Sequence, residues 1–364
     1  MARFRNLVRG DPAPWFRQRS AAQPNYSFDT VAGRYIVLCF FASAADARAQ
    51  AALAAVLAAP QVFDDAHASF FGVSNDPADE ARLRERYPGY RFFFDFDGTA
   101  ALLYGARAQD EDVLRRLWIV LDPALRVLHA APFDAASAEE IVALVAALPP
   151  PGRHGGVEAF PPVLQISDVF EPDLCRSLID AYESKGGEDS GFMRERDGKT
   201  VLVVDHQHKR RRDCIMQDPK LIAAVQDRVG RRIAPEINKA FAFHATRMER
   251  YLVGCYTAED RGHFRPHRDN TTKGTAHRRF AVTINLNSDF EGGTLSFPEY
   301  GPRAFKPPPG AAVVFSCSLL HTVAPVTSGK RYAFLPFLYD DAAAEERERN
   351  NQFLGSEIAP YRKG

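Results

Sequence analysis

The sequence contains few cysteines, no excess of either charge and no long apolar run. Its 5 cysteines are scattered and lack paired metal-binding spacing, so a disulfide framework is not expected. Lysine plus arginine number 46, as do aspartate plus glutamate, which leaves no overall field to attract nucleic acid or an anionic membrane. No segment has the apolar length of a membrane-spanning helix, and the first ten residues lack the core of a secretion signal. We therefore expect a cytoplasmic protein without a nucleic-acid or membrane partner.

A stretch rich in proline and glycine at 149–162 divides the chain. Neither a helix nor a central strand tolerates prolines at this density. A chain of 364 residues also exceeds the usual size of one domain. We predict a first domain over 1–148, a linker over 149–162, a second domain over 163–345 and a C-terminal tail over 346–364.

Before the linker, short apolar runs alternate with helical stretches. The runs at 35–41, 69–73 and 92–94 have the length and composition of buried strands. Ser137 and Glu140 have the spacing of a capping box, which predicts the start of a closing helix. Strands that alternate with helices indicate an α/β sheet, here a thioredoxin-like sandwich.

After the linker the pattern becomes mainly β. A helix is expected after Pro172, and apolar or alternating runs separated by glycine and proline follow at 280–286, 293–297, 311–315 and 332–338. Many short strands of this kind are typical of a double-stranded β-helix, or jelly roll, with supporting helices.

Three side chains in the second domain could share one metal ion. His267 and Asp269 lie two residues apart, so in an extended segment both project from the same face. His321 follows a predicted strand and offers a third ligand. Two imidazoles and one carboxylate leave open coordination positions, the arrangement that non-haem Fe(II) oxygenases use. The sequence therefore predicts a catalytic Fe(II) site formed by His267, Asp269 and His321.

An arginine follows the third ligand by ten residues. The guanidinium of Arg331 could form a bidentate pair with a dicarboxylate. Lys330 is the lesser rival, because neighbours on a strand point to opposite faces and only one can enter a pocket. His263 is interpreted as a loop residue, since the other three ligands complete the metal set. The polar run at 205–212 could cover the site and contact an acidic substrate, or it could simply be solvated.

Motifs in three segments together resemble a known enzyme family: Arg-Tyr-x-Val-Gly and Pro-His-x-Asp within 250–269, Gly-Gly-Thr-Leu-x-Phe at 292–297, and His-x-Val-x-Pro-Val-x-x-Gly-x-Arg at 321–331. They are similar to the prolyl 4-hydroxylase group of 2-oxoglutarate dioxygenases over about residues 160–345. The resemblance implies Fe(II), 2-oxoglutarate and O₂, with ascorbate as an auxiliary reductant. It also implies hydroxylation of a C–H bond, of proline or another residue, with release of succinate and CO₂.

The same resemblance implies residues that bind the cosubstrate. Arg331 would hold the distal carboxylate of 2-oxoglutarate, and Tyr251 would hydrogen-bond it. The stretch between Tyr256 and His267 is longer than the family pattern, which leaves the choice between Tyr251 and Tyr256 open.

The first domain resembles the peroxiredoxin family over about residues 8–148, in motifs at 10–16, 33–38, 71–76 and 95–98. The resemblance implies a thioredoxin-like fold. Aligned on the first strand, Ala49 stands at the position of the peroxidatic cysteine, Asp46 at the family threonine and Arg116 at the family arginine. Cys39 lies within the apolar strand, where a thiol is usually inert. We expect a redox-inactive domain that serves binding, homodimerisation or substrate presentation.

Other functions were weighed against this hypothesis. A thiol-dependent peroxidase with a secondary metal domain is the alternative, and the missing cysteine disfavours it. A non-catalytic iron- or oxygen-sensing module stays open, since the same ligands could support it. A kinase loop is discarded because Asn270 directly follows the aspartate of His-Arg-Asp instead of following it by five residues. Asp269 also excludes halogenating relatives, which lack that carboxylate. The substrate stays open between proteins, amino acids and small metabolites.

Overall fold

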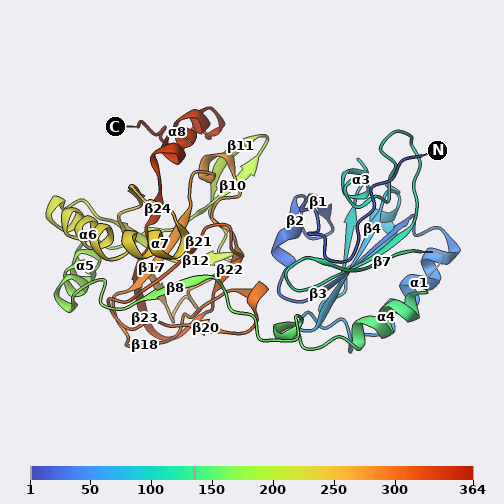
Figure 1. Ribbon diagram of the computed structural model, residues 1–364, viewed down its shortest axis with the longest axis horizontal. Helices are drawn as coiled ribbons and strands as arrows, with labels where there is room; N and C mark the ends of the chain where they lie inside the picture. Colours follow the sequence, from blue (N-terminus) through green and yellow to red (C-terminus); the bar gives the residue numbers. More distant parts are fainter. Residues whose placement is uncertain (1, 134–136, 364) are drawn as a thin grey trace. The chain divides into compact units, whose positions relative to one another are not determined.

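The computed structural model describes residues 2–133 and 137–363. It divides into two compact units (Figure 1), the first being Met1–Phe160 with Pro298–Pro302, and the second Pro161–Phe297 with Arg303–Gly364. The division after Phe160 falls within the proline-rich stretch. The short segment Pro298–Pro302 groups with the N-terminal unit, although we expected it in the second domain. No helix among the described residues has both the length and the apolar character needed to cross a membrane.

The N-terminal unit is built on a seven-stranded mixed sheet of order β2-β1-β5-β4-β3-β6-β7. β3 pairs in parallel with β4, β4 pairs in parallel with β5, and β6 lies antiparallel to β3. The strands are β1 (Arg17–Ser20), β2 (Tyr26–Ser27), β3 (Tyr35–Ala42), β4 (Ala68–Ser74), β5 (Tyr90–Phe94), β6 (Leu117–Leu121) and β7 (Val127–Pro132). The helices are η1 (Phe28–Val31), α1 (Ala47–Leu57), α2 (Asp79–Arg82), α3 (Thr99–Tyr104), α4 (Ala138–Ala146) and η2 (Pro151–Arg153).

Apolar residues line both faces of this sheet, and other parts of the N-terminal unit cover each face. Alternate residues of β3, from Tyr35 to Phe41, pack with α1 and α4 in one core cluster. On the other face an aromatic cluster forms from Phe16, Phe28, Phe93 and Tyr104. α4 begins with the expected capping box between Ser137 and Glu140. The thioredoxin-like α/β sandwich is therefore confirmed.

The C-terminal unit contains a ten-stranded and a five-stranded antiparallel sheet. The larger sheet runs β14-β24-β17-β23-β15-β13-β9, with β18, β21 and β8 paired at its sides, and the smaller runs β12-β16-β22-β19-β20. The strands are β8 (Val163–Ile166), β9 (Glu188–Asp189), β12 (Lys209–Arg210), β13 (Arg212–Ile215), β14 (Arg247–Glu249), β15 (Leu252–Thr257), β16 (His263–His267), β17 (Phe280–Asn285), β18 (Phe290–Gly292), β19 (Leu295–Ser296), β20 (Ala304–Phe305), β21 (Ala312–Ser316), β22 (His321–Val323), β23 (Val326–Phe334) and β24 (Phe337–Tyr339).

Helices support the larger sheet of this unit. α5 (Pro172–Lys185), α6 (Pro219–Arg232) and α7 (Ala234–Phe241) place apolar residues in one core cluster with β15, β17, β21 and β23. A separate hairpin is formed by β10 (Phe192–Arg196) and β11 (Lys199–Val203). The remaining helices are η3 (Lys273–Thr275), η4 (Pro298–Tyr300), α8 (Asp341–Arg349) and η5 (Asn350–Phe353). The predicted jelly roll with supporting helices is confirmed.

Two local expectations need correction. The predicted strand 293–297 is shortened to β19 (Leu295–Ser296), because Gly292 at the end of β18 and the adjacent Gly293 have φ of 72° and 60°, outside the extended region. The segment 346–364, expected to be a tail, includes the end of α8 and η5. Within it, Tyr361 packs against Tyr339 and Ala343, so this segment contributes to the core.

Candidate metal centre

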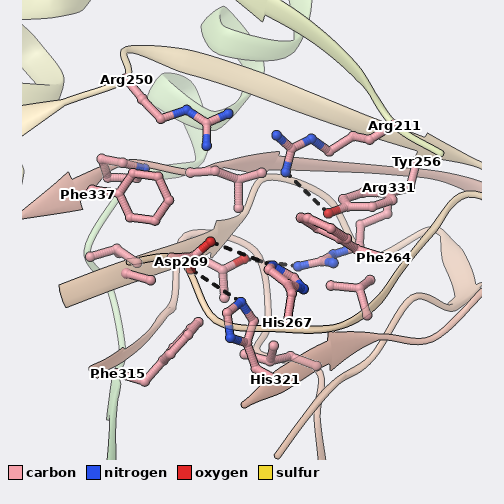
Figure 2. Close-up of a pocket in the computed structure, with 17 residues that line it drawn as sticks. Arg211, Arg250, Tyr256, Phe264, His267, Asp269, Phe315, His321, Arg331 and Phe337 are labelled. Carbon is pink, nitrogen blue, oxygen red and sulfur yellow. Dashed lines mark hydrogen bonds and ion pairs between the residues drawn. The ribbon is translucent and has the colours of Figure 1, made fainter. Parts of the chain in front are cut away.

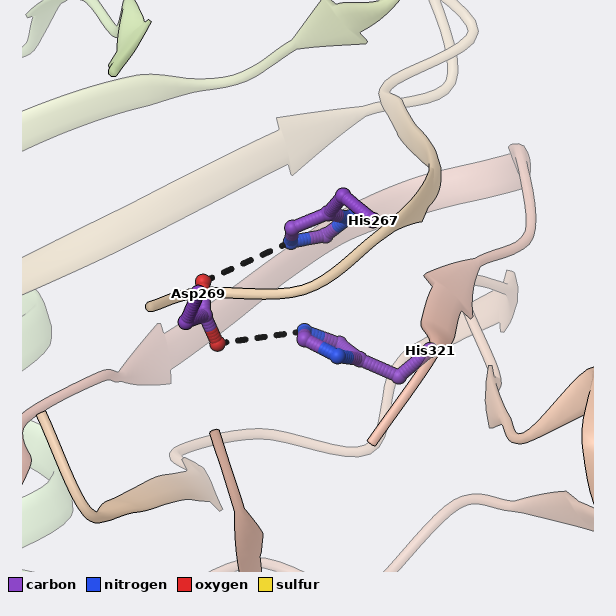
Figure 3. A group of neighbouring side chains, drawn as sticks. All are labelled: His267, Asp269 and His321. Atoms are coloured by element: carbon purple, nitrogen blue, oxygen red, sulfur yellow. Dashed lines mark ion pairs between the residues drawn. The ribbon is translucent and has the colours of Figure 1, made fainter. Parts of the chain in front are cut away.

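The three predicted ligands come together at the small sheet of the C-terminal unit. His267 ends β16 and lies directly opposite His321, the first residue of β22, while Asp269 follows two residues after His267. Nε2 of His267 is 3.6 Å from Oδ1 of Asp269, and Nε2 of His321 is 3.3 Å from Oδ2 (Figure 3). One ligand atom from each residue lies within 4.8 Å of the others. This spacing allows one ion to bind all three.

Hydrogen bonds orient both imidazoles toward the carboxylate. Nδ1 of His267 lies 2.7 Å from the carbonyl oxygen of Arg265, and Nδ1 of His321 lies 3.0 Å from that of Leu319. A carbonyl oxygen only accepts, so each Nδ1 carries the hydrogen and each Nε2 keeps a lone pair for a metal. The donor set therefore fits a divalent cation.

Electrostatics keep the ligands in the protonation states that a metal needs. Burial, with the nearby His267, lowers the pKa of His321 to about 4, so its imidazole is neutral near pH 7. Burial alone would raise the pKa of Asp269, but His321 and His267 outweigh it and hold that pKa well below its usual range. The site therefore presents a neutral imidazole at His321 and an ionised carboxylate at Asp269.

A cavity between the two sheets contains this group (Figure 2). Its empty space, counted together with the open solvent at its entrance, is about 510 Å³. The Phe264 ring stacks on His267 with ring centres 3.4 Å apart, and Phe315 lies edge-on to His321 at 4.7 Å. Each histidine of the group therefore packs against an aromatic ring of the cavity wall.

Arg331 lines the same cavity from β23. Its side chain is almost fully buried. Nε donates to Oδ1 of Asn285 and Nη2 to Oγ1 of Thr283, both at 3.0 Å, whereas Nη1 is buried without a hydrogen-bond partner. No carboxylate of residues 2–133 or 137–363 is found in an ion pair with it. Because a buried donor without a partner is costly, this nitrogen is suited to receive an acceptor from a ligand.

The tyrosine in the cavity is Tyr256, which corrects the choice of Tyr251. Tyr256 lies opposite Arg331 in the β15–β23 register, and the guanidinium carbon of Arg331 is 5.3 Å from its ring centre. Tyr251 precedes β15 and accepts a 2.7 Å hydrogen bond from Nε2 of Gln226 on α6. It packs at the helix-covered side of the sheet and does not line the cavity. The sheet places these two residues on different sides.

The rival residues lie outside the cavity. Lys330 points away from Arg331. The Lys330 side chain is 55% exposed, and its ammonium lies 3.4 Å from Oε1 of Glu183. His263 contacts the carbonyl oxygens of Arg261 and Gln207 at 2.9 and 3.3 Å. Neither lines the cavity.

Two arginines of the cavity wall were not identified from the sequence. Arg211 belongs to the polar run 205–212, most of which is exposed or half-buried, and Arg250 belongs to the motif around Tyr251. In the sequence, the signals for a role in the site were that Arg211 lies in a charged run and that Arg250 lies in a family motif. Neither signal shows which side chain faces inward.

Comparisons with known proteins agree with this site. Residues 251–339 match the model of the 2OG-Fe(II) oxygenase superfamily. The PKHD-type hydroxylase azo0608 of Azoarcus sp. (strain BH72) is 28% identical over 190 residues, which are 48% of this chain and 77% of the relative. The matches to the first curated relatives, PKHD-type hydroxylases of Synechococcus and Pseudomonas fluorescens, span only 39% of their length.

Two solved structures are similar to parts of this chain. A Pseudomonas putida prolyl-4-hydroxylase has a TM-score of 0.36 and 17% identity, covering 49% of this chain and 91% of that protein. Peroxidoxin BcpB from Mycobacterium tuberculosis has a TM-score of 0.35 and 20% identity, covering 40% of this chain and 99% of that protein. The segment that matches the family model contains His267, Asp269, His321 and Arg331 of the cavity.

Proposed function

We propose that the C-terminal unit is an Fe(II)- and 2-oxoglutarate-dependent dioxygenase that hydroxylates a C–H bond. In this reaction O₂, 2-oxoglutarate and the substrate R–H give R–OH, succinate and CO₂. The observation that carries the proposal is one cavity that contains both the His267, Asp269 and His321 group and the unpartnered Nη1 of Arg331. A metal ligand set and a buried cation within one cavity fit a metal-bound dicarboxylate.

The three ligands would hold Fe(II) by two Nε2 atoms and a carboxylate oxygen, which leaves positions for cosubstrate and O₂. Iron with bound 2-oxoglutarate and O₂ supplies the oxidising power for C–H hydroxylation. The hydrogen bonds from Nδ1 of His267 and His321 hold both rings in their ligating orientation.

The second task of the cavity is to bind the cosubstrate. Nη1 of Arg331 would donate to the distal carboxylate of 2-oxoglutarate, and the Tyr256 hydroxyl would donate to the same group. Phe264 and Phe315 would exclude water from the reacting atoms.

The primary substrate is proposed to be a peptide residue, proline being one candidate, or a small molecule of similar size. The peroxidase alternative has little support, because Cys39 is fully buried and burial raises the pKa of its thiol well above the usual range. Ascorbate as a reductant, the homodimer and the cytoplasmic location stay predictions.

Succinate release tests this proposal. The full-length protein, loaded with Fe(II) under argon and then exposed to air, should convert 2-oxoglutarate to succinate faster when a pool of peptides or amino acids is added. The His267→Ala variant should release succinate at least 100-fold more slowly than wild type and should bind less iron. His263 lies outside the cavity, so the His263→Ala variant should keep the wild-type rate and iron content. Wild-type protein that binds iron tightly but never turns over 2-oxoglutarate would instead favour a sensing module.

A further inference from the structure

Two further arginines line the metal cavity besides Arg331. Arg211 lies beside Tyr256, with its Nη1 3.4 Å from the tyrosine hydroxyl. Arg250 lies beside Phe337, and Figure 2 shows its guanidinium pointing toward the interior from a different part of the wall than Arg331. Cosubstrate binding as proposed uses Arg331 and leaves these two cations without a function.

Arg211 already has a carboxylate partner. Its Nε and Nη2 donate to the two oxygens of Asp213 at 2.6 and 2.7 Å. Ser190 donates to Oδ2 of the same carboxylate. Arg211 is also only 5% exposed, so we interpret it as a structural partner of Asp213.

Arg250 contacts the same Asp213 carboxylate less closely than Arg211 does. Its Nη2 reaches Oδ2 of Asp213 at 3.3 Å, an oxygen that Arg211 and Ser190 already occupy. Lys209 is a third basic group near Asp213, and its Nζ donates to Ser190 and to the carbonyl oxygen of Gly191, while burial lowers its pKa well below the usual range. The two guanidinium groups of Arg211 and Arg250 thus share one carboxylate, which leaves a local excess of positive charge.

The neighbouring carboxylate does not relieve this excess. Glu249 directly precedes Arg250, but its Oε1 pairs with Arg278 at 2.6 Å and its Oε2 with Arg347 at 2.6 Å. The Glu249 side chain is therefore fully engaged on the other side of the strand. Among the described residues the charge of Arg250 is left only partly compensated.

The backbone of Arg250 also adopts an uncommon conformation. Its φ is 69°, in the left-handed region that residues other than glycine seldom adopt. Such strain persists where the surrounding structure requires it, and it is concentrated at functional sites. The Arg250 side chain is 27% exposed, and its guanidinium carbon is 5.2 Å from the centre of the Phe337 ring. This cation is held in place and remains accessible to a ligand.

We propose that Arg250 binds a carboxylate of the primary substrate, so that the enzyme acts on an acidic compound rather than on a neutral prolyl residue. This proposal rests on the dioxygenase function proposed above. The carboxylate could be the α-carboxylate of a free amino acid or the side chain of an acidic residue in a peptide. Either would place an anion beside the partly compensated guanidinium and its C–H bond toward the metal ligands.

Matched compounds distinguish these sources. To test the α-carboxylate, free L-amino acids are compared with their primary amides. To test an acidic side chain, N-acetyl-aspartate amide and N-acetyl-glutamate amide are compared with the corresponding asparagine and glutamine compounds. In at least one set, the carboxylate should stimulate succinate release at least 10-fold more than its neutral partner. Arg250→Gln should raise the KM for that carboxylate at least 10-fold and change the KM for 2-oxoglutarate less than 2-fold. Arg250→Lys should restore part of the affinity, and Arg231→Gln, an exposed arginine on α6, should change neither value.

Chemical labelling gives a readout that needs no turnover. Phenylglyoxal modifies accessible guanidinium groups, and mass spectrometry of the wild-type chain should show that the carboxylate compounds protect Arg250 at least 5-fold better than their neutral partners. Protection without succinate release would support the carboxylate site while contradicting the dioxygenase function. Equal effects of carboxylate and neutral compounds, or selective protection of Arg250 by 2-oxoglutarate, would overturn the proposal.

Discussion

Arg331 and Tyr256 illustrate how single residues define this cavity. They form a directly opposed cross-strand pair, so their side chains share one face of the sheet. Burial lowers the pKa of Arg331, although the group remains charged near pH 7. The cavity therefore contains a cation whose free Nη1 is best satisfied by a carboxylate ligand.

Arg331→Ala should weaken 2-oxoglutarate binding far more than iron binding. Removing a buried charge-assisted pair costs about 2–5 kcal/mol, so the KM for 2-oxoglutarate should rise by roughly 30-fold or more. Iron content, measured by a colorimetric chelator, should stay near one per chain. Lys330→Ala is the control, because Lys330 is exposed and contacts Glu183. An impaired Lys330 variant beside a normal Arg331 variant would reverse the assignment.

Tyr256→Phe should weaken cosubstrate binding moderately. The hydroxyl contributes one hydrogen bond, worth about 0.5–1.5 kcal/mol, so the KM for 2-oxoglutarate should rise roughly 2- to 12-fold. Tyr251→Phe removes only the bond to Gln226 and should leave that KM unchanged. Steady-state kinetics of both variants decide between the two tyrosines, and an effect confined to Tyr251 would restore our original choice.

At the scale of elements, a buried carboxylate on β14 forms an ion pair with α8 and so links this helix to the larger sheet. Glu249 is 7% exposed and pairs with Arg278 before β17 and with Arg347 on α8. Burial alone would raise the pKa of Glu249, but Arg278 and its other neighbours outweigh it and hold the pKa well below the usual range. This ionised group joins a segment that we expected to be a tail to the domain core.

Glu249→Gln should destabilise the protein by about 3–5 kcal/mol, because it leaves two arginines beside a neutral group. Urea unfolding followed by far-UV circular dichroism measures the loss. Glu171→Gln is a suitable control, since Glu171 is 41% exposed and its pairs with Arg228 and Arg232 should contribute at most about 1 kcal/mol. Similar losses in both variants would contradict the structural role of Glu249.

The stability of the wild-type protein should depend on pH through the same residue. A carboxylate with a depressed folded pKa stabilises the fold above its unfolded pKa of about 4.3 and loses that contribution as the pH falls through this value toward the folded pKa. The urea midpoint should therefore fall more between pH 5 and pH 3 in wild-type protein than in Glu249→Gln. Parallel pH profiles would show that Glu249 contributes little.

At the scale of the whole molecule, the jelly-roll unit that contains the metal cavity is joined to a unit with a thioredoxin-like fold. In that unit Asp46 caps α1 and accepts hydrogen bonds from the amides of Arg48 and Ala49 at 2.9 and 3.2 Å. Arg116 pairs with Asp46 at 2.8 Å. The start of this helix is thus occupied by a carboxylate of the chain itself, where a peroxidase needs a thiolate.

The full-length protein should have no thiol peroxidase activity. Kept free of iron with a chelator, it should fail to consume hydrogen peroxide with dithiothreitol or thioredoxin as reductant, because the helix start offers Ala49 and Cys39 is buried. Cys39→Ser should behave like wild type in a ferrous-xylenol assay of residual peroxide. Sustained turnover that disappears in Cys39→Ser would identify Cys39 as a nucleophile.

Local patterns were enough to predict much of this protein. Strand alternation separated Arg331 from Lys330, the two-residue spacing put His267 and Asp269 together, and Ser137 with Glu140 predicted the start of α4. Each of these inferences depends on geometry within a few residues, which the backbone repeats of helices and strands dictate.

Tertiary structure decided the rest, because it depends on which strands pair and which face of each strand meets the cavity. The β15–β23 register selected Tyr256 over Tyr251, and the packing of the two sheets brought Arg211 and Arg250 into the cavity wall. These contacts join residues far apart in the chain, so no local periodicity predicts them. The sequence by itself predicted the fold class and the three candidate metal ligands, whereas the charges that line the cavity became visible only when the sheets were assembled.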